Sequence, residues 1–393
     1  MLNRAFILAG AMAVLAVPAL AQQQGVKIGL ITTLSGPQAG LGREMVDGFN
    51  LGVKHAGGKL GGLATEVIVG DDQFKPDVGK SLAERMVQRD RVDIVTGVVF
   101  SNILLALSDS VLQDRRGVFL INSNAGPSQL AGKDCHPNFF STSWQNDNVH
   151  ESMGQHMQNA GIKRAYIMAP NYPAGKDALA GFKRFFKGEI VAEVYTQLGQ
   201  TDYAAEISTL RAARPDATYF FYPGGMGIAF VRQYAQAGVV QQIPLFGPSF
   251  SLDQTILPGI GDAALGLYAS TFWSERLQNA ANDRFVRDFE ATFNRIPSPY
   301  AAQSYDAAML IDAAIKAAGG SLANKDAFRA ALRAAKFDSV RGPLKFNKNH
   351  FPIQNYYLTQ IAKDDKGRLV MDPKGVIFKD HADAYAKDCG MTW

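Results

Sequence analysis

Short apolar runs alternate along this chain with segments whose apolar residues recur every three or four positions. Residues 26–31 form one such run, and Val46, Phe49 and Val53 then mark one face of a helix. Further apolar runs lie at 66–69, 92–95 and 118–121. Strands separated by helices of about 10 to 15 residues indicate a parallel sheet that is covered on both faces. The pattern therefore predicts an α/β fold.

A second series of the same kind begins after Ser141. Its apolar runs lie at 165–169, 190–195, 219–222, 244–246 and 264–271. The helical pattern that follows, with Phe285, Phe289 and Phe293 at spacing four, no longer alternates with strands. Because the first series has too few helices to cover both faces of its sheet, we expect the chain to return to that sheet.

The two series and the return of the chain predict two Rossmann-like lobes with parallel sheets, joined by a three-crossing hinge near residues 142, 270 and 342. The N-terminal lobe is expected to contain residues 26–142 and 271–342. The C-terminal lobe and tail are expected to contain residues 143–270 and 343–393. Several crossings leave a hinge few degrees of freedom, which suits closure around a ligand.

The first 21 residues have the pattern of an export signal. Arg4 precedes an apolar run over 5–20, and Ala19-Leu20-Ala21 offers a cleavage site with small residues. The alternative is a membrane anchor, but the run is shorter than the roughly 20 residues that a span needs, and it contains Pro18. We therefore expect residues 1–21 to be a cleaved signal peptide and the mature chain to be in solution outside the cytoplasm.

Charge and cysteine content narrow the function further. Forty basic residues face 36 acidic ones, for a net charge of +4, and the charges are scattered without runs. This balance argues against nucleic acid or a membrane surface as a partner.

The only cysteines are Cys135 and Cys389, and in an oxidising compartment we expect a disulfide between them, the alternative being two unpaired thiols. Six scattered histidines give no legible metal site, and no cofactor is predicted.

Several short motifs recur in one order along the chain. They are Ser35-Gly36-Pro37, Asp71-Asp72, the turns at 97–101 and 124–127, Gly247-Pro248, and Ser304-Tyr305-Asp306. With them, the whole mature chain resembles the type I periplasmic solute-binding proteins of the branched-chain amino acid group of ABC importers. The resemblance implies a periplasmic location, a small-molecule ligand and a membrane ABC permease as partner. We expect the protein to act as a monomer.

Open α/β sheets bind ligands outside the carboxyl ends of their strands. The residues expected there are Leu41, Phe100, Ser101, Asn124, Ala125, Trp144, Tyr172, Tyr222, Met226, Ser249, Phe250 and Trp273. Ser101 is expected to cap the following helix, where its hydroxyl and the free amides suit a carboxylate. The alternative is an ordinary N-cap, but the resemblance implies that Ser101 binds the carboxylate and that Asn124 and Ala125 form a second anchoring segment. Asn124 could instead simply adopt a left-handed turn.

The second lobe departs from the pattern of the amino-acid binders that the chain resembles. They carry an acidic residue after the Gly-Pro to pair with the ammonium group, whereas Ser249 follows Gly247-Pro248 here. Burying an ammonium group without an anionic partner costs several kcal/mol, so an amino acid is disfavoured unless Asp253 or Glu275 reaches the site.

Six of the expected site residues are aromatic, which favours a flat ring, although each of them could equally pack in a core. The sequence therefore predicts a receptor for an aromatic acid of the benzoate or coumarate kind. The alternative is a branched-chain amino acid, amide or urea receptor of the same fold.

Two further motifs fall short of enzyme and nucleotide sites. The segment 247–251 lacks the final glycine of the GxSxG nucleophile elbow and carries Pro248 inside it. The glycines at 224–227 lack the GK[ST] ending of a phosphate loop and the full GxGxxG spacing. We therefore predict a binding protein and not an enzyme.

Overall fold

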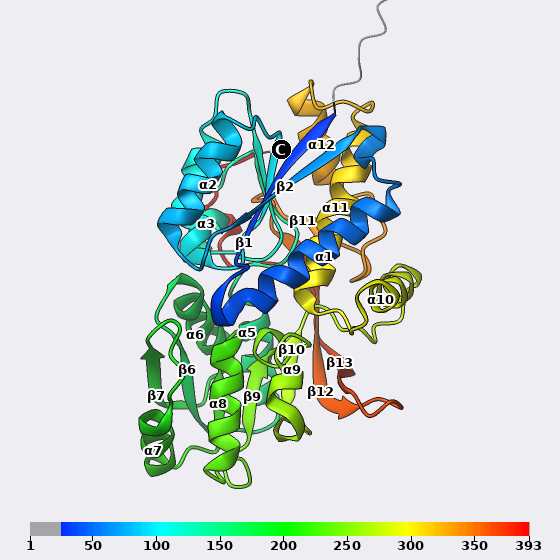
Figure 1. The fold of residues 1–393 in the computed structure, drawn as a ribbon. Helices are drawn as coiled ribbons and strands as arrows, with labels where there is room; N and C mark the ends of the chain where they lie inside the picture. The colour runs from blue at the N-terminus through cyan, green and yellow to red at the C-terminus, as the bar shows by residue number, and fades with distance from the viewer. Residues whose placement is uncertain (1–24, 393) are drawn as a thin grey trace, which may run out of the picture.

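The computed structural model describes residues 25–392. The expected signal peptide, residues 1–21, lies outside this range. No helix within the described range is long and apolar enough to cross a membrane. The described chain forms two α/β lobes, one above the other in Figure 1.

The first lobe is built on a five-stranded parallel sheet with the order β2-β1-β3-β4-β5. Its strands are β1 (Val26–Thr32), β2 (Thr65–Asp71), β3 (Ile94–Gly97), β4 (Phe119–Asn122) and β5 (Phe139–Ser141). The helices α2 (Pro76–Gln88) and α3 (Ser101–Leu112) cover one face, and α1 (Ala39–His55) lies on the other (Figure 1). The short helix α4 (Ser128–Ala131) follows β4.

The second lobe contains a larger mixed sheet with the order β11-β12-β10-β9-β8-β6-β7. The parallel strands are β6 (Arg164–Pro170), β7 (Glu189–Thr196), β8 (Ala217–Phe220), β9 (Leu245–Pro248) and β10 (Tyr268–Thr271). The antiparallel additions are β11 (Lys345–Phe346), β12 (Pro352–Lys363) and β13 (Leu369–His381), which pairs with β12.

Successive residues of β8 show how helices cover both faces of the second sheet. Tyr219 stacks on Phe182 of α6 (Pro173–Phe185), beside α5 (Asn148–Asn159). Phe220 packs on Phe230 of α8 (Gly225–Gln236), and α7 (Ala204–Ala213) lies on the same side. The short helix α9 (Leu257–Ile260) follows β9. Both faces are therefore apolar, as the sequence pattern predicts for parallel strands.

The chain returns to the first sheet after β10. Helix α10 (Ala280–Phe293) leads to α11 (Pro299–Ala317) and α12 (Lys325–Ala334), whose apolar faces share a core with β1. The chain then runs back to the second sheet at β11, so it passes between the lobes three times. The α/β fold with two lobes is confirmed. The strand expected over 264–271 begins only at Tyr268, because residues 261–264 form a 3₁₀ turn.

The cysteines tie the C-terminal tail to the first lobe. Cys135, in the loop after α4, forms a disulfide with Cys389, and their Cα atoms are 5.7 Å apart. Lys348 Nζ donates a hydrogen bond to the Cys389 carbonyl at 2.9 Å. The expected pairing is therefore present, and the tail is held against the loop that follows residue 130.

Candidate functional site

The carboxyl ends of strands from both lobes face one another across a small cavity. Its walls are Val99, Phe100, Ser101, Asn124, Ala125, Trp144, Asn146, Tyr172, Ala174, Phe221, Pro223, Phe250 and Tyr300. The cavity volume is about 10 Å³, which is roughly the space that one water molecule needs. A larger ligand therefore enters only if the lobes or the wall side chains move apart.

Six of the thirteen wall residues are aromatic. Trp144 and Phe250 lie with their ring centroids 4.3 Å apart, and Tyr300 meets Phe250 edge-on at 5.2 Å. Tyr172 lies between Phe100 at 6.2 Å and Phe221 at 6.4 Å. No lysine, arginine, aspartate or glutamate lines the cavity. The wall is thus suited to a flat apolar body and offers no partner to a cation.

Ser101 lies at the polar edge of the cavity, and its place in α3 differs from the expectation. It is the first residue of the helix, while Phe100 occupies the N-cap position without a side-chain cap. Ser101 is 1% exposed, and its Oγ accepts a hydrogen bond from Asn146 Nδ2 at 3.1 Å. Because that contact uses a lone pair, the hydroxyl proton remains available to an acceptor in the cavity.

The turn before α3 has an unusual backbone that aims the helix at the cavity. Gly97 has φ 100°, and a Cβ atom there would lie 2.3 Å from the Ile31 carbonyl oxygen. Val98 has φ 54°, a left-handed conformation that β-branched residues rarely adopt. Such strain persists where the surrounding structure holds it, and it is concentrated at functional sites. The turn therefore brings the free amides of the first turn of α3 to the cavity.

Asn124 and Ala125 hold the neighbouring loop together. Asn124 Nδ2 donates to the Val99 carbonyl at 2.7 Å, and its Oδ1 accepts from Gln303 Nε2 at 2.5 Å. The amide of Ala125 donates to the Val98 carbonyl at 3.2 Å. Asn124 is not among the described residues with positive φ, so the left-handed alternative is wrong. Both residues line the cavity, but the polar groups named here are already engaged within the protein.

Three residues expected at the strand ends lie in cores instead, which corrects their assignment to the cavity wall. The Tyr222 ring packs on Tyr203 and Phe230, and its hydroxyl accepts from Thr196 at 3.1 Å. Met226 lies in the first turn of α8, and its buried sulfur accepts from the Gly199 amide in the loop after β7. Trp273 donates to Asn282 Oδ1 at 2.7 Å and packs on Phe285.

Two other expected residues lie next to the cavity but outside its wall, so they are corrected as well. Leu41, in the first turn of α1, approaches Gly224 from the first lobe. Ser249 directly precedes Phe250, and its buried Oγ has no hydrogen-bond partner among residues 25–392. Expected residues that do meet at the cavity are Phe100, Ser101, Asn124, Ala125, Trp144, Tyr172 and Phe250.

Six of the wall residues were not predicted from the sequence. They are Val99, Asn146, Ala174, Phe221, Pro223 and Tyr300. Phe221 was included in an expected strand, but β8 ends one residue before it. Asn146 follows the first crossing, and Tyr300 lies in the first turn of α11 after the second crossing. A search for polar and aromatic residues at the crossings could have found both.

Asp253 and Glu275 were the two acidic residues that could have reached the site to pair with an ammonium group. Neither lines the cavity. Asp253 Oδ1 accepts from the amide and hydroxyl of Thr255, and burial raises the pKa of Asp253 to about 7. Glu275 Oε1 accepts from the Met371 amide and from Gln254, and burial raises its pKa to about 7 as well. Asp253 therefore stabilises its own loop, and Glu275 is bonded to the β12–β13 hairpin.

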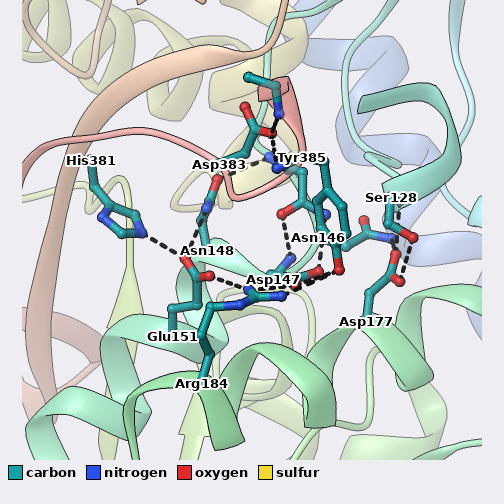
Figure 2. Close-up of polar contacts among 12 residues, drawn as sticks. Ser128, Asn146, Asp147, Asn148, Glu151, Asp177, Arg184, His381, Asp383 and Tyr385 are labelled. Atoms are coloured by element: carbon teal, nitrogen blue, oxygen red, sulfur yellow. Dashed lines mark hydrogen bonds and ion pairs between the residues drawn. The ribbon is translucent and has the colours of Figure 1, made fainter. Parts of the chain in front are cut away.

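A buried polar cluster, drawn in Figure 2, joins the two lobes and the tail, and Asn146 connects it to Ser101. Asp177 on α6 accepts from Ser128 and Asn146, as Figure 2 shows. Arg184 forms ion pairs with Asp147 and Glu151. Burial, reinforced by Asp177, raises the pKa of Asp147 to about 7.

The tail closes the same cluster from the other side. Tyr385 donates to Asp147 Oδ2 at 2.9 Å, and His381 Nε2 lies 2.6 Å from Glu151 Oε2. Within the described residues, no group of three or more His, Cys, Asp or Glu side chains is placed to hold a metal ion. The cluster is therefore a set of paired charges that joins the crossing segment, α5, α6 and the tail.

Comparison with known proteins identifies a family and solved structures that are similar to this chain. Residues 25–367 match the family described as periplasmic binding protein. A solute-binding protein of an ABC transporter from R. palustris, in complex with benzoate, is 33% identical, with a TM-score of 0.88, over 93% of this chain and 100% of that one. A second such protein, from Rhodopseudomonas palustris BisB5 in complex with 3,4-dihydroxybenzoic acid, is 31% identical with a TM-score of 0.84, over 92% and 99% of the two chains.

A curated relative carries a different ligand in its name. Leu/Ile/Val-binding protein homolog 6 of Brucella melitensis is 27% identical over 354 residues, which cover 87% of this chain and 89% of that protein.

Proposed function

The chain belongs to the periplasmic binding protein family, and from that premise we propose that it captures a small aromatic carboxylate of the benzoate or coumarate kind. The observation that carries this proposal is the cavity wall: six aromatic rings, three polar side chains and no charged group. In this role the protein delivers its ligand, as a monomer, to the permease of an ABC importer.

The polar edge of the cavity supports a carboxylate as the bound group. The Ser101 hydroxyl and the first amides of α3 lie together, and the positive end of the helix dipole favours negative charge there. The hydroxyl can donate to a carboxylate, because its oxygen already accepts from Asn146. A singly charged acid thus finds donors at one end and rings around the rest.

The alternative is a branched-chain amino acid, which the name of the Brucella relative favours. Binding an amino acid would also bury its ammonium group, and a buried ammonium group needs an anionic partner. Ser249 stands where the resembled amino-acid binders carry an acid, and neither Asp253 nor Glu275 lines the cavity. The two R. palustris proteins are in complex with benzoate and 3,4-dihydroxybenzoic acid, which favours the aromatic acid.

Binding requires the lobes to open and close. The cavity of about 10 Å³ is too small for a benzoate ring with the walls as they lie. We propose that residues 26–142 with 271–342 move as one lobe and residues 143–270 with 343–393 as the other. The three crossings restrict that motion to opening and closing the shared edge.

A ligand panel tests the proposed function. Calorimetric titrations or melting shifts should show binding of benzoate, 4-hydroxybenzoate or coumarate, and none for leucine, isoleucine, short amides or urea. A ligand of about 10 heavy atoms that binds at about 1 μM requires about −8 kcal/mol, which such a site can supply. A melt that shifts only with leucine-like ligands would contradict the proposal.

A variant at the anchor tests the assigned pose. Ser101→Ala should weaken benzoate binding by about 1.5–3 kcal/mol, because the hydroxyl makes a charge-assisted hydrogen bond. Ser108→Ala is the matched control, since its hydroxyl donates to the Leu105 carbonyl within the same helix, outside the cavity wall. Equal affinities of the two variants would remove Ser101 from the binding site.

A further inference from the structure

We infer that Asp177 and Asn146 are positioning residues that orient the Ser101 hydroxyl and clasp the two lobes together around the ligand. We call Ser128, Asp177, Asn146 and Ser101 the interlobe clasp. The inference rests on the proposed function insofar as Ser101 binds a carboxylate. It adds that this serine acts only when a hydrogen-bond chain from the opposite lobe holds it.

Asp177 is the centre of the clasp. Its side chain on α6 of the second lobe is 8% exposed and accepts three hydrogen bonds. Ser128 of the first lobe donates from its amide at 3.0 Å to Oδ2 and from its hydroxyl at 2.8 Å to Oδ1. Asn146 Nδ2 donates to Oδ2 at 2.9 Å. One carboxylate thus joins α4, the first crossing segment and α6.

Asn146 transmits this arrangement to the anchor. Its Nδ2 donates both to Asp177 and to Ser101 Oγ, and its Oδ1 accepts from the Gly126 amide at 2.9 Å. All the hydrogen-bonding groups of the amide are therefore satisfied, and only one orientation of the side chain allows this. Because Nδ2 always donates to Ser101, the serine proton is directed away from Asn146 and toward the cavity.

The clasp also connects closure to ligand release. Ser128 begins a helix that follows β4 of the first sheet, and Asp177 lies in a helix that follows β6 of the second sheet. Their hydrogen bonds form only when the cleft edges meet, so they stabilise the closed lobes. Loss of the clasp should therefore accelerate ligand release more than it slows capture.

The negative charge of Asp177 is not what this role requires. Arg184 and Tyr385 interact electrostatically with Asp177, and Asp147 is a second acid nearby. An asparagine at position 177 can keep the geometry, because its oxygen accepts from the Ser128 amide and from Asn146. Its NH₂ group then donates to Ser128 Oγ, which reverses that one bond.

The test compares Asp177→Ala, Asp177→Asn and Asn146→Ala with wild type, using benzoate and L-leucine as probes in stopped-flow and calorimetric titrations. Asp177→Ala and Asn146→Ala should raise the dissociation rate of the carboxylate about 10-fold, with a smaller change in the association rate. Asp177→Asn should bind within about threefold of wild type. Asp312→Ala is the matched control, since this buried aspartate serves Gly61 and Lys316 in the first lobe.

The outcomes separate the clasp from the proposed function. If Asp177→Asn loses as much affinity as Asp177→Ala, the residue acts through its charge and the inference is overturned. Wild-type release rates in Asp177→Ala would overturn it too. If wild type binds leucine and not benzoate, the proposed function fails, while the same variants still test the clasp because leucine carries a carboxylate.

A measurement on the ligand-saturated protein completes the test, with whichever of benzoate and L-leucine wild type binds. Hydrogen exchange should show a protected Ser128 amide in wild type and in Asp177→Asn, and faster exchange at that amide in Asp177→Ala. If this amide exchanges at the same rate in all three ligand-saturated proteins, the clasp does not form in the closed state and the inference is overturned.

Discussion

The carboxyl ends of the two sheets meet at one cavity but supply different chemistry. The end of the first sheet provides a strained turn at 97–98, the start of α3 and the Ser101 hydroxyl. The end of the second sheet provides the rings of Phe221 and Phe250 together with Pro223, and no charged group. In the proposed function, the first lobe therefore binds the carboxylate of the ligand, and rings of the second lobe contact its apolar body.

This difference follows from what each kind of recognition requires. A carboxylate needs donors at fixed positions, so the first lobe sets its backbone in sparsely populated conformations and holds Ser101 through Asn146. An aromatic ring needs only contact area and offset stacking, which several ring arrangements satisfy. The first lobe should therefore decide whether an anion binds, and the second lobe which anion.

The largest effect should come from reversing the charge preference of the first lobe. Ser101→Asp places a carboxylate against the carboxylate of the ligand, which should weaken benzoate binding by at least about 1,000-fold, or about 4 kcal/mol. The fold should persist, because an acidic residue in the first turn suits the helix dipole. Calorimetry measures the affinity and a thermal melt the fold. A folded variant that binds benzoate within tenfold of wild type would contradict the division between the lobes.

The disulfide should affect stability without affecting either end of the cavity. Replacing Cys135 and Cys389 together by serine should lower the free energy of unfolding by about 2–5 kcal/mol, because the bond closes a loop with a sequence separation of 254 residues. Benzoate affinity should stay within about threefold, since neither residue lines the cavity. Denaturant unfolding and calorimetry check the two parts, and a large loss of affinity would show that the tail shapes the site.

The second lobe contains a buried carboxyl group whose pKa is raised into the neutral range. Burial, reinforced by Glu44 and Glu275, raises the pKa of Asp253 from 3.8 to about 7. A raised pKa means that the folded state holds the proton more tightly. The stabilisation is therefore complete below about pH 4 and is lost as the pH rises to about 7 and beyond.

The loss should be on the order of 2–4 kcal/mol in the free energy of unfolding. Asp253→Asn should lack this part of the pH dependence, because an amide does not titrate. Denaturant unfolding at a series of pH values from 4 to 8 measures the difference between the two proteins, and parallel curves would show that Asp253 is ionised throughout.

The smallest effect should come from a ring in the second lobe. Phe250→Leu keeps an apolar side chain but removes the contacts with Trp144 and Tyr300. Benzoate affinity should fall by about 0.5–1.5 kcal/mol, whereas cyclohexanecarboxylate affinity should change less. The ratio of the two affinities in calorimetry reports this difference. Equal losses for both acids would mean that the wall recognises volume and not aromaticity.

Sequence patterns predicted the fold more completely than the site. The alternation of strands and helices identified both sheets and the return of α11 to the first, because buried parallel strands are continuous apolar runs. The three-residue β5 was too short for any periodicity to indicate it. Helix α12 was missed although its buried residues Phe328 and Leu332 lie at the helical spacing of four.

For the site, proximity to a strand end was a necessary but insufficient guide. Phe250 and Tyr222 both lie near strand ends, yet only Phe250 faces the cavity, while Tyr222 packs against α8. Successive side chains at a strand end point to opposite faces of the sheet, and an error of one residue in the end of the strand reverses the assignment. Phe221 was missed for this reason.

The sequence by itself determined the α/β class, the two wound sheets, the pairing of the only two cysteines and the position of Ser101 after β3. These depend on local periodicity, composition and chain order. Only the tertiary structure decided that Asn146 connects Ser101 to Asp177, that Tyr300 completes the wall and that Asp253 and Glu275 lie outside it. Such contacts join residues far apart in the chain, and the packing of one lobe against the other brings them together.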